Sequence, residues 1–67
     1  MLDELKSEII ELEANHKKLH DRYVTIAISE LFRTHPLKDE VLELIMDGLH
    51  HLELSIKARR ELIAGMN

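Results

Sequence analysis

The sequence predicts an all-α protein, an antiparallel hairpin of two long helices at about residues 2–33 and 37–64. Apolar residues recur at alternating steps of three and four along both segments, the spacing that places side chains on one face of a helix. One proline and two glycines among 67 residues leave room for very few turns. We therefore expect a single helical-hairpin domain that spans residues 1–67.

The first helix carries an apolar seam that begins at Leu2 and runs at heptad spacing to Tyr23 and Ile26. Such a seam is typical of a coiled coil. After Tyr23 the apolar pattern shifts and widens towards Val24 and Phe32, and a shift of this kind relaxes the supercoil and broadens the face available for packing. The half of this helix nearest the turn is therefore expected to be the more deeply buried half.

The turn is predicted around the single proline, Pro36. Proline disfavours helix in the preceding residue but fits the first turn of a helix. The carboxylates of Asp39 and Glu40 suit the positive end of a helix dipole. The first helix should end near Arg33, and the second should begin between Pro36 and Asp39. The alternative is one continuous helix that is kinked at Pro36.

The order of charges favours antiparallel pairing of the two helices. If the turn centres near residue 35, facing residues have numbers that sum to about 70. The acidic segment 3–13 then lies beside the basic segment 57–60, whereas a parallel arrangement would pair two acidic helix starts. The same rule sets the basic segment 17–22 level with Asp47 and Glu53.

A hairpin of this size is expected to associate, because two helices that touch along one seam leave its flanks in water. The chain has no cysteine, so disulfides do not compensate for the small core. We expect a homodimer, or a tetramer, in which hairpins form a four-helix bundle. Three small residues on one side of the second helix, Gly48, Ser55 and Ala58, would allow another helix to approach closely. The predicted self-association interface consists of Leu5, Ile9, Leu12, Leu19, Tyr23, Ile26, Ile28, Phe32, Leu42, Ile45, Leu49, Leu52 and Ile56.

Five histidines form the one unusual feature of the composition. His16 and His20 are four residues apart on one helix, a spacing that can place two imidazoles on one metal ion. The facing rule brings His50 and His51 to the same level. A zinc, nickel or cobalt site and a cluster that charges near pH ~6.5 are the functional interpretations. The favoured interpretation is hydrogen-bonded surface or interface histidines, with no metal and no cofactor.

Catalysis finds no support in the sequence. There is no cysteine, no glycine-rich phosphate loop, and no serine set on a strand-to-helix turn. A rod of two helices also offers no deep pocket in which to shift the pKa of a carboxylate. No apolar run approaches the length of a membrane span. We expect a non-enzymatic, cytoplasmic protein that does not interact with membranes.

The favoured function is a small regulatory module that associates with itself and binds another macromolecule, a protein or an RNA. Lys17, Lys18 and Arg22 are candidate contacts to RNA phosphates, although a solvated helix face is the simpler explanation. In length and one-turn layout the chain resembles the Rop-type plasmid copy-number regulators, a resemblance that implies an RNA-binding dimer. Pro36 in the turn departs from that layout. A third interpretation is an acidic inhibitor that offers segment 3–13 to a nucleic-acid-binding partner.

Overall fold

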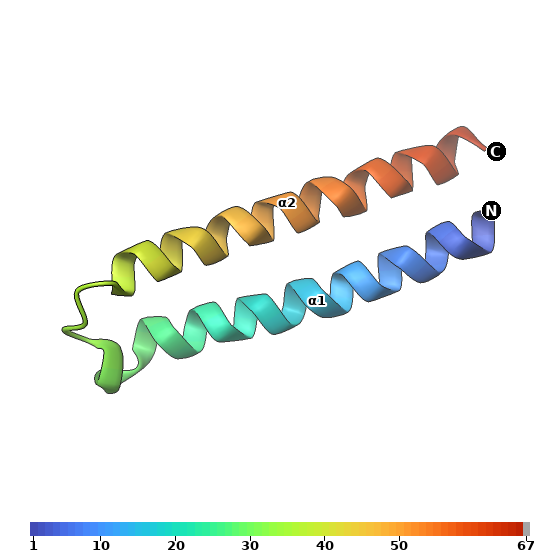
Figure 1. Cartoon of the computed structure of the whole chain (residues 1–67). Coiled ribbons are helices and arrows are strands. Elements are labelled where there is room, and N and C mark those ends of the chain that lie inside the picture. Colours follow the sequence, from blue (N-terminus) through green and yellow to red (C-terminus); the bar gives the residue numbers. More distant parts are fainter. Residues whose placement is uncertain (67) are drawn as a thin grey trace.

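The computed structural model describes residues 1–66 and contains two antiparallel helices that lie side by side. Helix α1 spans Leu2–Ile28 and helix α2 spans Lys38–Gly65. A short 3-10 helix, η1 (Glu30–Phe32), lies in the connection between them, and both termini are at the other end of the rod (Figure 1). The prediction of an all-α hairpin is confirmed, and the alternative of one continuous kinked helix is wrong.

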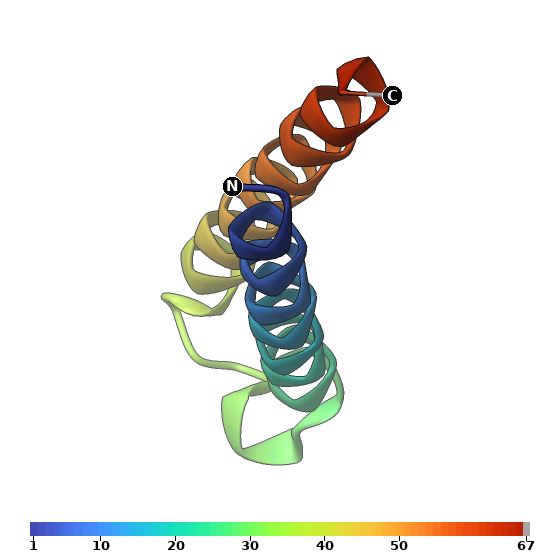
Figure 2. The ribbon, with the colours of Figure 1, turned by 90° about the vertical axis from the view of Figure 1, so that its right-hand side faces the viewer.

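The hairpin is a rod with no third layer. Its principal extents are 51 × 15 × 12 Å. Its radius of gyration is 15.5 Å, whereas a compact domain of this length would have a value of about 11 Å. Figure 2 looks along the rod from the termini and shows the two helices inclined to each other. Each helix therefore contacts the other on one side and has solvent on its remaining sides.

Helix α1 ends at Ile28, five residues before the predicted end at Arg33. The last turn is rich in β-branched residues, which are weak helix formers, and the hydroxyl of Thr25 donates to the carbonyl of Asp21 at 2.9 Å. Ser29 then adopts an extended conformation, with φ −70° and ψ 127°. The predicted end was wrong because the apolar pattern continues into η1, where the backbone has already left the α-helix.

The connection is held by contacts between the end of α1 and the start of α2. The ammonium group of Lys38 donates to the carbonyl of Ala27 at 3.1 Å, which satisfies one of the unpaired carbonyls at the C-terminus of α1. The imidazole Nδ1 of His35 accepts a hydrogen bond from the backbone N–H of Leu37 at 3.1 Å. Helix α2 begins at Lys38, two residues after Pro36, as the sequence predicts.

Three ion pairs found among residues 1–66 join the two helices and fix their register; one of them, His16 with Glu53, carries both charges only when the histidine is protonated. The residue numbers of the partners sum to about 70 in each pair, so the predicted antiparallel alignment is confirmed. All three pairs are exposed, and each therefore contributes only ~0.2–1 kcal/mol to stability. The partners are Arg59 Nε with Glu8 Oε2 (2.8 Å), Arg60 Nη2 with Glu13 Oε1 (2.5 Å) and His16 Nε2 with Glu53 Oε1 (3.1 Å).

The core of the hairpin is small and lies away from the turn. Among residues 1–66 the buried apolar side chains are Ile9, Leu49 and Ile56. Val24 and Ile28, in the half of α1 nearest the turn, are 41% and 76% exposed. The expectation that this half is the more deeply buried is therefore wrong. The apolar face does widen there, but α2 covers only one edge of it.

Candidate functional surfaces

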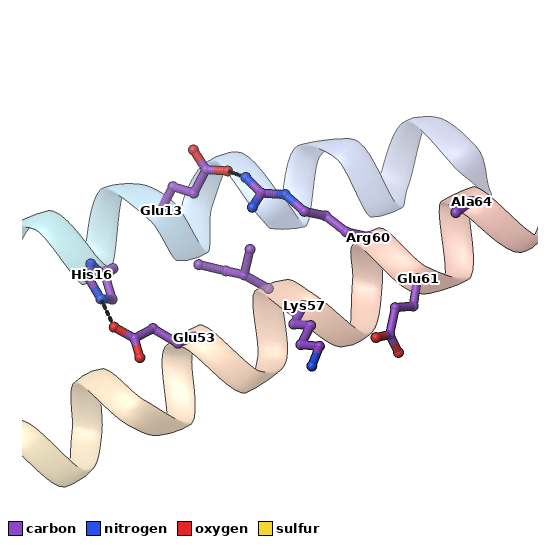
Figure 3. A pocket seen from close by; sticks show the side chains of 8 residues that line it. Glu13, His16, Glu53, Lys57, Arg60, Glu61 and Ala64 are labelled. Atoms are coloured by element: carbon purple, nitrogen blue, oxygen red, sulfur yellow. Dashed lines mark hydrogen bonds and ion pairs between the residues drawn. The ribbon is translucent and has the colours of Figure 1, made fainter.

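An open groove of about 630 Å³ runs between the two helices near the termini (Figure 3). Its apolar floor includes the buried side chain of Ile56. Two of the interhelical ion pairs cross it, Glu13 with Arg60 and His16 with Glu53 (Figure 3). Glu13 is paired with Arg60, and Glu53 is hydrogen-bonded to His16, so these polar groups of the rim already have partners within the hairpin. Its remaining lining residues are Lys57, Glu61 and Ala64 of α2.

The histidines do not form a ligand set. His16 is paired with Glu53, and its side chain is 28% exposed. The rings of His50 and His51 have centroids 6.4 Å apart and planes tilted by 52°, as expected for neighbours that diverge by about 100° around a helix. Across residues 1–66 no three histidine, aspartate or glutamate side chains are grouped so that they could hold a metal ion. The candidates His16, His20, His50 and His51 are thus not brought together.

The basic residues of α1 are exposed but do not share one face. Lys17, Lys18 and Arg22 take part in none of the ion pairs found among residues 1–66. Lys17 and Lys18 diverge by about 100° around the helix, whereas Lys18 and Arg22 lie about 40° apart. The carboxylate of Glu53, which the sequence sets level with these residues, is instead occupied by His16.

Part of the acidic segment 3–13 serves the hairpin itself. Glu8 accepts from Arg59, and Glu13 accepts from Arg60. Arg59 is held further by a hydrogen bond from Nη1 to the carbonyl of Ser55 at 3.2 Å. The predicted pairing of this segment with the basic end of α2 is therefore confirmed. Fewer carboxylates remain free for an outside partner than the sequence suggests.

The residues predicted for self-association fall into three groups by exposure. Three are the buried residues of the core, and most of the others are only half-buried between α1 and α2. Solvent therefore reaches one edge of the seam along most of the hairpin. The half-buried members are Leu5, Leu12, Leu19, Tyr23, Ile26, Leu42, Ile45 and Leu52, and the exposed members are Ile28 and Phe32.

A second line of residues runs along the flank of α2 opposite the groove, beside the seam. Its members recur at heptad spacing, and none carries a carboxylate, an ammonium or a guanidinium group. The sequence drew attention only to the small residues in its middle. Exposure of Leu44 (69%) and Leu62 (57%) shows that α1 leaves the ends of the line uncovered. We call this line the outer stripe; it consists of Val41, Leu44, Gly48, His51, Ser55, Ala58 and Leu62.

The structure thus offers three surfaces: the groove, the divided basic patch of α1 and the outer stripe of α2. Neither described helix has an apolar stretch sufficient to cross a membrane. Comparison with protein-family models, with characterised proteins and with solved structures finds no match to this chain.

Proposed function

We propose that the chain is a non-enzymatic helical interaction module that associates with itself and, as a dimer, presents its outer surfaces to another macromolecule. The observation that carries the proposal is the amount of surface the single hairpin leaves in water. The accessible surface is 5490 Å² for a chain of 7.8 kDa. A compact monomer of that mass exposes about 4,400 Å², so the hairpin exposes roughly a quarter more than expected.

The exposed surface is rich in apolar side chains, which supports association rather than a large surface that results only from the elongated shape. Of the large apolar side chains in residues 1–66, fourteen are at least 38% exposed, against three that are buried. Each Å² of apolar surface left in water costs about 25 cal/mol, and a chain with so small a core has little other stabilisation. A second hairpin would cover the exposed apolar residues and the open edge of the seam together.

Light scattering coupled to size-exclusion chromatography tests the proposal. We expect a particle with twice the 7.8 kDa mass of the chain, or a higher even multiple, that dissociates on dilution. The mass should be unchanged by EDTA, because the histidines are not grouped as metal ligands. A helical particle that keeps the monomer mass at millimolar concentration would contradict the proposal.

RNA binding is a second candidate, favoured by one observation: Lys17, Lys18 and Arg22 are exposed and outside the ion pairs of residues 1–66. Cations that are free in this way can displace counterions from phosphates. Under this proposal, the double variant Lys17→Glu, Lys18→Glu abolishes a salt-sensitive gel shift with structured RNA. Lys6→Glu, on the same helix, is the control. An equal shift for both variants would remove RNA binding as a function of this surface.

A further inference from the structure

We draw no further inference here: the strongest candidate, the groove with an apolar floor between α1 and α2 near the termini, has the polar groups of Glu13, Arg60, His16 and Glu53 on its rim already partnered within the hairpin, and nothing in the structure shows what covers it.

Discussion

At the scale of single residues, Gly48 is a position where α2 lies very close to α1. A Cβ atom at this position would lie 3.0 Å from Cδ2 of Leu19, a distance tighter than ordinary van der Waals contact. The helix thus carries a residue of poor helical propensity at a place where the neighbouring helix needs the space. By contrast, a Cβ atom on Gly65 would meet no atom within 4 Å.

We predict that Gly48→Val lowers the free energy of unfolding by about 1 kcal/mol or more, because the branched side chain must displace Leu19. Leu19→Ala should recover part of that loss in the double variant by removing the atoms that collide. Urea denaturation followed by circular dichroism gives all four free energies of the double-mutant cycle. Purely additive effects would show that the two side chains do not compete for the same space.

Two arginines near the end of the hairpin that carries the termini, Arg59 and Arg60, differ in how much they stabilise it. Arg59 contacts both Glu8 and the carbonyl of Ser55, and its side chain is 32% exposed. Arg60 pairs with Glu13 and has no second hydrogen-bond partner among residues 1–66, and its side chain is 63% exposed. We predict that Arg59→Ala lowers the free energy of unfolding by about 1 kcal/mol and Arg60→Ala by less than about 0.5 kcal/mol. Equal losses in urea denaturation would contradict this ranking.

At the scale of the elements, the start of α2 was predictable and the end of α1 was not. Pro36 and the carboxylates that follow it are local signals, and helix formation at Lys38 obeys them. No such signal marks Ile28, since the apolar pattern runs on to Phe32. The carbonyl of Ala27 is satisfied by Lys38, which is eleven residues away. The apolar periodicity of a single helix cannot predict this hydrogen bond, because its donor belongs to the other helix.

The burial of individual seam residues could not be predicted from the sequence, for a related reason. The heptad pattern correctly placed Ile9, Leu49 and Ile56 on the seam. It did not distinguish them from residues such as Tyr23 and Ile45, which are only half-buried. Burial depends on how many elements surround a position, and periodicity identifies a face without counting its neighbours. The pairing of segment 3–13 with the basic end of α2 was easier to predict, because it follows from the antiparallel register alone. The pair of His16 with Glu53 was not predicted, since the register set Glu53 beside the basic segment 17–22.

The contact between Lys38 and α1 gives a prediction about the connection. Lys38→Met keeps most of the aliphatic chain but removes the donor to the carbonyl of Ala27. We expect a loss of about 1–2 kcal/mol in the free energy of unfolding, since the bond is charge-assisted and part-buried. Lys38→Arg, which keeps a cationic donor, should lose less. Equal stability of Lys38→Met and the wild type in urea would show that the bond does not hold the connection.

At the scale of the whole molecule, the rod shape explains both how few contacts stabilise the hairpin and why so many apolar side chains are exposed. A rod 51 Å long and 12 Å thick has no interior beyond a single seam. In the described part of the chain, residues 1–66, three buried residues and three ion pairs hold the two helices together. The apolar residues that a larger protein would bury remain on its surface. Association is therefore the expected route by which such a fold becomes stable at low concentration.

The position of the buried residues determines where the hairpin opens. Among residues 1–66, the buried residues Ile9 and Ile56 and the three ion pairs lie towards the termini, and the third buried residue, Leu49, lies near the middle of α2. Backbone amides in segments 21–28 and 38–46 should therefore exchange with deuterium faster than those in segments 8–15 and 52–59. The opposite order, measured by NMR, would show that the helices separate from their free ends. If the turn end opens first, the helix ends that carry the two termini stay in contact while the connection opens and closes. Sequences fused to the two termini would then stay beside each other throughout this local opening.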